Sequence, residues 1–90
     1  MTRIVIGEGF CEIGGHAPDP AVCHGISAIS QMLGNYLERD GLGVMEKGEG
    51  YLKITQNKKC KQMEGIGILF GAAYHAFTDI AEEYPGNIEI

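Results

Sequence analysis

The stretch Gly15-His16-Ala17-Pro18-Asp19-Pro20-Ala21-Val22-Cys23 marks the point where the hydrophobic pattern of the chain changes from strand to helix. Before it, short apolar runs are separated by a glycine-containing turn, and after it apolar residues recur every three or four positions. Asp19 is a suitable N-cap, and Pro20 suits the first helical position because the N–H that it lacks would have no partner there. The stretch therefore predicts a helix that begins close to residue 20.

Two hairpins are predicted, one on each side of this helix. The β-rich runs Arg3–Ile6 and Phe10–Ile13 flank a glycine-containing turn, so residues 2–14 are expected to form the first hairpin. The second is expected over residues 42–56, where Tyr51–Thr55 alternates apolar and polar side chains after a second glycine-containing turn. A polar loop from Gln56 to Lys61 follows.

Two amphipathic helices are predicted from apolar stripes at helical spacing. The first runs to about Glu38, and the second carries a stripe from Ile66 to Tyr84 before Pro85-Gly86 ends it. Residues 87–90 suit a short edge strand. The residues expected between the helices and the sheet are Val22, Ile26, Ile29, Leu33, Leu69, Ala73, Phe77 and Ile80.

The predicted element order is ββαββα with this additional C-terminal strand. Strands that follow one another in hairpins form an antiparallel sheet, and two amphipathic helices can cover one of its faces. The sequence therefore predicts an α+β fold, a two-layer sandwich with a mostly antiparallel sheet and two helices on one face. Ninety residues leave no room for a second core, so residues 1–90 are expected to form a single domain.

Charge and composition exclude several classes of partner. A net charge of −5 argues against nucleic acid, which requires a basic face, and the basic cluster Lys58-Lys59-Cys60-Lys61 is interpreted as a solvated loop. No apolar run approaches the roughly 18–20 residues that span a bilayer, and the first residues do not resemble a signal peptide. Three cysteines, an odd number, indicate free thiols and a cytoplasmic protein.

Cys23 and His16 are the candidates for chemistry. Cys23 falls in the first turn of the predicted helix, where unpaired N–H groups and the helix dipole favour a thiolate. His16 lies in the loop before it, and a loop that turns back would bring imidazole and thiol within hydrogen-bond reach, as a cysteine nucleophile needs. Ser27 lies one turn further on the same helix face, where it can line the site or bond to a helix carbonyl. Asp19 is interpreted as a helix cap, with orientation of His16 as a second role.

Other interpretations of these residues remain open. Cys23 alone would also suit a small buried position, since free cysteine is among the most buried residue types. Cys11, His16, Cys23 and His24 are residue types that zinc accepts, but no CxxC or HxxxH pair organises them, so no metal site and no cofactor are expected.

The motifs resemble those of the ribosomal-processing cysteine proteases, the Prp family. The resemblance rests on Gly15-His16-Ala17, on Ala21-Val22-Cys23 at the start of a helix with Ser27 four residues on, and on Ile80-Ala81-Glu82-Glu83-Tyr84-Pro85 before a final strand. It covers nearly the whole chain. It implies a cysteine endopeptidase in which Cys23 attacks the scissile carbonyl, His16 acts as base and acid, and helix-start N–H groups stabilise the oxyanion.

The same resemblance implies the partners. The substrate would be the N-terminal extension of a large-subunit ribosomal protein, or capsid or scaffold proteins if the gene is viral or prophage-borne. A homodimer is also expected, since the domain is small and Gly65, Gly67 and Gly71 permit close approach of a partner. The sequence departs from the family in a shorter loop between His16 and Cys23. The alternative function is therefore a non-catalytic, homodimeric interaction module on the same fold.

Overall fold

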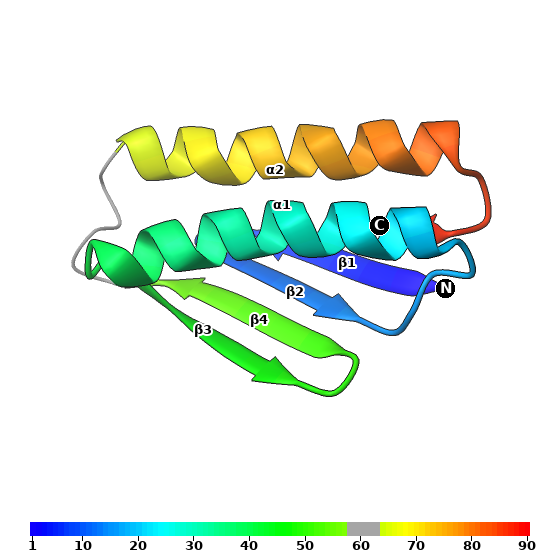
Figure 1. The fold of residues 1–90 in the computed structure, drawn as a ribbon. Coiled ribbons are helices and arrows are strands. Elements are labelled where there is room, and N and C mark those ends of the chain that lie inside the picture. The colour runs from blue at the N-terminus through cyan, green and yellow to red at the C-terminus, as the bar shows by residue number, and fades with distance from the viewer. Residues whose placement is uncertain (58–63) are drawn as a thin grey trace.

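Within the described residues, a pair of strands precedes each of two helices, in the order that the sequence predicts (Figure 1). The computed structural model describes residues 1–57 and 64–90. Within them the elements are β1 (Thr2–Gly7), β2 (Phe10–Gly14), α1 (Pro20–Arg39), β3 (Gly43–Gly48), β4 (Tyr51–Gln56), α2 (Glu64–Glu83) and β5 (Ile88–Glu89).

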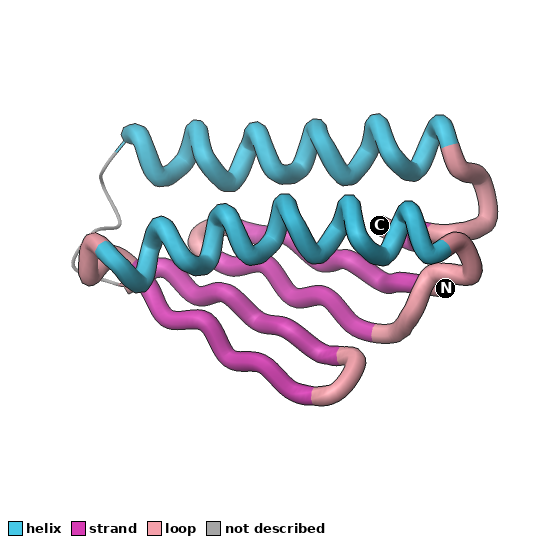
Figure 2. The backbone as a smooth tube through the Cα atoms, in the orientation of Figure 1, coloured by secondary structure: helices cyan, strands magenta, loops and turns pink. Residues whose placement is uncertain are grey.

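The described strands form one five-stranded sheet in the order β3-β4-β2-β1-β5. β5 pairs parallel with β1 through Thr2↔Ile88 and Arg3↔Glu89, and the other neighbouring strands are antiparallel. Both helices cover the same face of the sheet (Figure 2). The predicted α+β sandwich with two helices on one face is therefore confirmed, and so is the short C-terminal edge strand.

The core lies between the helices and this face of the sheet. Each predicted interlayer residue belongs to it, either fully buried (Val22, Ile26, Leu33, Ala73 and Phe77) or half-buried against the same cluster (Ile29, Leu69 and Ile80). On the sheet side, Ile4, Cys11, Ile13 and Ile54 alternate with exposed or half-exposed neighbours, as strands with one covered face require.

The buried stripe of α2 differs from the predicted one at two positions. Phe70 is 6% exposed and continues the spacing that begins with Ile66; the sequence-based stripe omits it and includes its neighbour Leu69, which is half-buried against the same core. Tyr84 was expected to end the stripe, but α2 ends at Glu83 and Tyr84 is 36% exposed. A residue that precedes proline is disfavoured in the helical conformation, which explains why the helix stops there.

The segment that joins β4 to α2 is only partly described. Gln56, which was expected in the loop, is the last residue of β4. The basic cluster at 58–61, with Cys60, lies outside the described residues. No helix within 1–57 or 64–90 combines the length and the apolar character that crossing a bilayer requires.

α1 lies against β3 near Gly34 and separates from it toward the β3–β4 turn. A Cβ atom at Gly34 would overlap the thioether of Met45, so glycine permits the close approach. Met45 N–H also donates a hydrogen bond to Glu38 Oε2 (3.0 Å) near the end of α1. The hairpin turn lies away from α1 in Figure 1, and a cavity lies where the two elements diverge.

Burial of Cys11 at the centre of the sheet raises the pKa of its thiol to about 11. In the unfolded chain a cysteine ionises at about 8.5, so between these values the unfolded state loses a proton that the folded state retains. The free energy of unfolding is therefore expected to fall as pH rises above about 9, by up to roughly 3 kcal/mol. Urea unfolding at a series of alkaline pH values measures this slope.

Cys11→Ala is the control for this prediction. The variant leaves Tyr51, whose pKa is also raised by desolvation and by its hydrogen bond to Glu12 (3.2 Å). It should be less stable than the unmodified protein near neutral pH, because it leaves a small cavity, but its stability should decline less steeply at alkaline pH. An equally steep decline in the variant would show that Cys11 does not cause the effect.

Candidate functional site

The main candidate site is a cavity of about 260 Å³ between the first half of α1 and the tip of the β3–β4 hairpin. Its lining includes both residues predicted to be catalytic, His16 and Cys23. α1 also contributes Ser27 and Gln31, and the hairpin contributes Lys47 among others. Residues that are far apart in the sequence therefore meet at one opening.

The start of α1 fixes the position of Cys23. Asp19 has an extended backbone, and its carboxylate accepts a hydrogen bond from Ala21 N–H (2.9 Å), while Pro20 occupies the first helical position. Cys23 follows in the first turn, half-buried in the cavity wall. The predicted cap at Asp19 is confirmed, and this residue supports the site through the helix start rather than from within the cavity.

A glycine turn directs His16 toward the tip of the hairpin. Gly15 has a φ of +84°, and its N–H donates a hydrogen bond to Gly50 O (3.0 Å) in the β3–β4 turn. A Cβ atom at Gly50 would lie only 3.0 Å from His16 Nε2, so the imidazole rests directly on this turn. Glycine at both positions is therefore what allows the loop to turn back over the sheet.

The backbone of Ala17 holds the Cys23 sulfur. Ala17 N–H donates to Sγ (3.3 Å), and the thiol donates to Ala17 O (3.4 Å). Among the described residues these are the hydrogen bonds of the Cys23 side chain. The N–H of Ala17 can continue to donate to the sulfur after the thiol has lost its proton, which stabilises the thiolate.

Ser27 and Gln31 form a polar pair on the cavity side of α1. Ser27 Oγ accepts a hydrogen bond from Gln31 Nε2 (2.7 Å), one helical turn away. Ser27 therefore lines the cavity, which is one of the two roles that the sequence allowed. The other role, donation to helix carbonyls, belongs to Ser30, whose hydroxyl donates to Ile26 O (2.8 Å) and Ser27 O (3.2 Å). The prediction missed Gln31, although its helical spacing of four from Ser27 could have revealed it.

The N–H groups of the first turn already have acceptors. Ala21 donates to the Asp19 carboxylate, and Val22 and Cys23 donate to the Asp19 carbonyl oxygen at 3.0 and 3.2 Å. An oxyanion would have to compete with Asp19 for these donors. The expected role of the helix-start N–H groups is therefore not pre-formed in this structure.

The four cysteine and histidine residues that could have suggested a zinc site do not converge. His16 and Cys23 share the cavity, but Cys11 lies in the core and His24 is exposed outside the cavity lining. In the described parts of the chain, no group of three or more histidine, cysteine or acidic side chains is placed to hold a metal ion.

The structure thus defines a class of protein: a small α+β sandwich with a cysteine at the start of its first helix and a histidine on the preceding loop. The ribosomal processing protease Prp from S. aureus, in complex with a covalently linked product peptide, shares the fold with a TM-score of 0.76 and 21% identity, over 98% of this chain and 93% of that chain. The structure of the same S. aureus protease in complex with a substrate peptide matches with a TM-score of 0.75 and 18% identity, over the same shares of the two chains.

A third solved structure, SMU.848 from Streptococcus mutans, matches with a TM-score of 0.74 and 25% identity, over 98% of this chain and 88% of that chain. No protein-family model and no curated protein matches the sequence. The comparisons confirm the fold that the resemblance to Prp implies.

Gly50→Ala is expected to displace His16 from the hairpin tip. The substitution adds a Cβ beside the imidazole, and the backbone φ of +67° also makes alanine costly, by about 1 kcal/mol. Gly41→Ala is the matched control, because Gly41 has a φ of +69° with no neighbouring atom within 4 Å. Both variants should lose similar stability, but only Gly50→Ala should shift the His16 ring resonances in NMR spectra. Equal shifts in both variants would contradict the contact.

Proposed function

We propose that this protein is a cysteine endopeptidase with Cys23 as nucleophile and His16 as general base. The observation that carries the proposal is that both side chains line one cavity at the start of α1. The fold supports it, because the same fold is found in a protease in complex with a product peptide. The arrangement of a thiol at a helix start beside an imidazole is the one that cysteine nucleophiles use.

The reaction begins when the Cys23 proton moves from its bond with Ala17 O to the imidazole of His16. The thiolate then attacks the scissile carbonyl carbon and forms a tetrahedral intermediate. Collapse of the intermediate breaks the C–N bond, and the imidazolium of His16 gives its proton to the leaving amine. Water, deprotonated by the same imidazole, hydrolyses the thioester and regenerates the thiol.

The substrate that the resemblance favours is the N-terminal extension of a large-subunit ribosomal protein. Support comes from the structural similarity to a ribosomal processing protease, at 21% identity. Capsid or scaffold proteins are the substrate if the gene belongs to a virus or prophage. A cavity open at the helix start suits an unstructured terminal segment, which can enter it without unfolding a domain.

Cys23→Ala and His16→Ala are each expected to abolish peptide cleavage, with losses of roughly 1,000-fold or more, because the members of a nucleophile–base pair act as a unit. The substrates are synthetic N-terminal segments of bacterial large-subunit ribosomal proteins and of phage capsid proteins, and mass spectrometry detects the products. His24→Ala is the matched control, because His24 is exposed and lies outside the cavity lining.

The outcomes separate the two functions. Cleavage that survives Cys23→Ala would overturn the assigned nucleophile. Peptides that bind but are not cleaved by the unmodified protein would favour the non-catalytic interaction module. In that case, iodoacetamide should alkylate Cys23 no faster than an ordinary exposed thiol.

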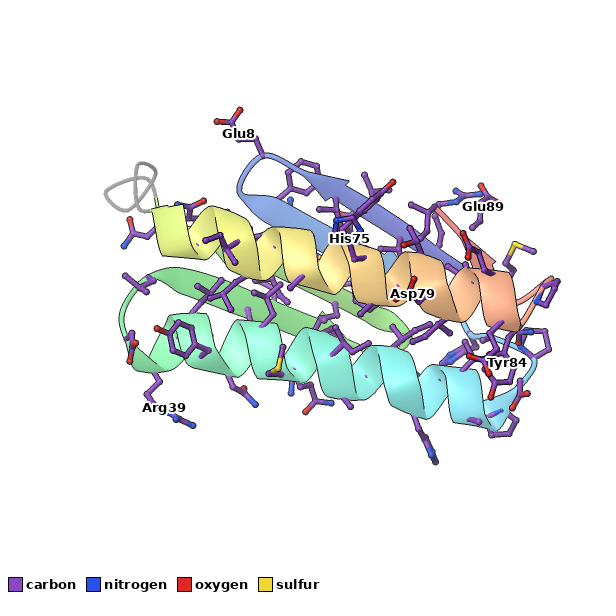
Figure 3. The ribbon with its side chains drawn as sticks, turned by 90° about the horizontal axis from the view of Figure 1, so that it is seen from above. Glu8, Arg39, His75, Asp79, Tyr84 and Glu89 are labelled. Carbon is purple, nitrogen blue, oxygen red and sulfur yellow. The ribbon has the colours of Figure 1, made fainter. Side chains whose placement is uncertain are left out.

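We also propose that two copies of the chain form a dimer through the first half of α2. On its outer face Ile68 is 71% exposed, and a Cβ atom at Gly67 or Gly71 would meet no other atom within 4 Å. Seen from the helix side, the second half of α2 carries His75 and Asp79, so the apolar part of this face is its first half (Figure 3). A smooth apolar helix face of this kind suits close helix–helix packing.

Light scattering tests the dimer directly. The unmodified chain is expected to show about twice its mass of 9.7 kDa at micromolar concentration, and Ile68→Glu should reduce the mass to that of one chain. Val44→Glu is the control, because Val44 is 56% exposed but lies on the sheet face away from the helices. A single-chain mass for the unmodified protein would rule out the dimer.

A further inference from the structure

The cavity is too small to hold a peptide substrate on its own. Its volume of about 260 Å³ is below the roughly 300–1,000 Å³ of pockets that enclose drug-sized ligands. It therefore accommodates a short stretch of chain around the scissile bond. The flanking residues of a substrate must bind to a surface next to the cavity.

The outer edge of β3 is such a surface. β3 is at one end of the sheet order, so no strand of the described residues pairs with the outer side of its backbone. Met45 N–H donates to Glu38 rather than into the ladder with β4, which places the backbone groups of Met45 on the outer side. Because orientation alternates along an antiparallel pair, Lys47 N–H and C=O point outward as well. Among the described residues, neither group has a hydrogen-bond partner.

Lys47 connects this edge to the site. It is the β3 residue whose side chain faces α1 at the point where the hairpin diverges, and it lines the cavity that contains Cys23. An extended peptide that leaves the cavity on this side would meet the free N–H and C=O of Lys47. Addition of a strand to an exposed sheet edge is a common mode of peptide recognition, because main-chain hydrogen bonds bind any sequence.

The length of the free edge favours a peptide over a second copy of β3. Glu38 occupies the Met45 N–H, so pairing cannot continue along the strand beyond that point. The groups that remain available for pairing are the N–H and C=O of Lys47 and the C=O of Met45. So short an edge suits transient binding of substrate, and the carboxylate of Glu38 is of the kind that protects edges from pairing between copies.

We propose that the substrate backbone pairs with β3 at Lys47 as an added strand, with Glu38 marking the end of the pairing. The inference rests on the proposed peptidase function and specifies how that site holds its substrate. The main-chain pairing gives affinity without selecting side chains. Selection among substrate side chains is therefore made by the cavity.

Lys47→Pro tests the pairing, because proline removes the outward N–H without removing a bond of the β3–β4 ladder. The probe is the peptide cleaved fastest among the N-terminal segments of ribosomal and capsid proteins. KM for this peptide is expected to rise at least tenfold, with a smaller change in kcat. Lys47→Ala, which removes the ammonium group and keeps the N–H, measures the contribution of the side chain. The inference requires a rise in KM at least fivefold larger for proline than for alanine.

Versions of the same peptide that are N-methylated at one residue at a time provide a second measurement on the unmodified protein. One methyl group should raise KM at least tenfold, at the residue whose N–H donates to Lys47 O. If the Lys47→Pro variant does not fold, the N-methylated peptides alone decide whether the edge pairing exists. Equal effects of proline and alanine, or the lack of a sensitive N-methyl position, would overturn the edge pairing while cleavage continues. If no peptide is cleaved or bound, the proposed function falls and the pairing falls with it.

Discussion

The hydrogen bond from Asp19 N–H to Asn87 Oδ1 (2.8 Å) holds together the parts of the molecule that build the site. Asn87 also accepts from Thr2 N–H through its carbonyl (2.9 Å) and donates through Nδ2 to Tyr84 O (3.3 Å). One residue, through its side chain and its backbone carbonyl, thus connects the cap of α1, the start of β1 and the end of α2. The direction in which α1 leaves the sheet, and with it the position of Cys23, depends on this junction.

Most of the fold could be predicted because local signals and long-range packing agree. The alternation of Leu52 and Ile54 in a strand, and the spacing of Val22, Ile26 and Leu33 in a helix, each indicate one buried face. Two helices and four hairpin strands with matching apolar faces have few ways to bury them. The parallel pairing of β5 with β1 could not be derived from such patterns, because a two-residue strand carries no periodicity and is placed by Asn87.

The site could be predicted only in part. The sequence pattern singles out His16 and Cys23, because glycines, a cap and a proline around them indicate a sharp turn before a helix, and both side chains line one cavity. The contacts that position them could not be predicted, because they are made by backbone groups, such as Ala17 with the sulfur and Gly50 beneath the imidazole. Gly50 looked like an ordinary turn residue. Only the fold shows that the absence of its side chain makes room for the histidine.

The separation of Asp19 and Asn87 by 68 positions gives the site a particular place in the order of folding. During synthesis on the ribosome, both hairpins and α1 have been made before Asn87 exists, and local pairs form more readily than contacts between distant positions. The helix that carries Cys23 can therefore form early, while its start is fixed only after the segment around Asn87 has been made. A nascent chain without Asn87 would hold the Cys23 thiol less firmly than a chain in which Asn87 is in place.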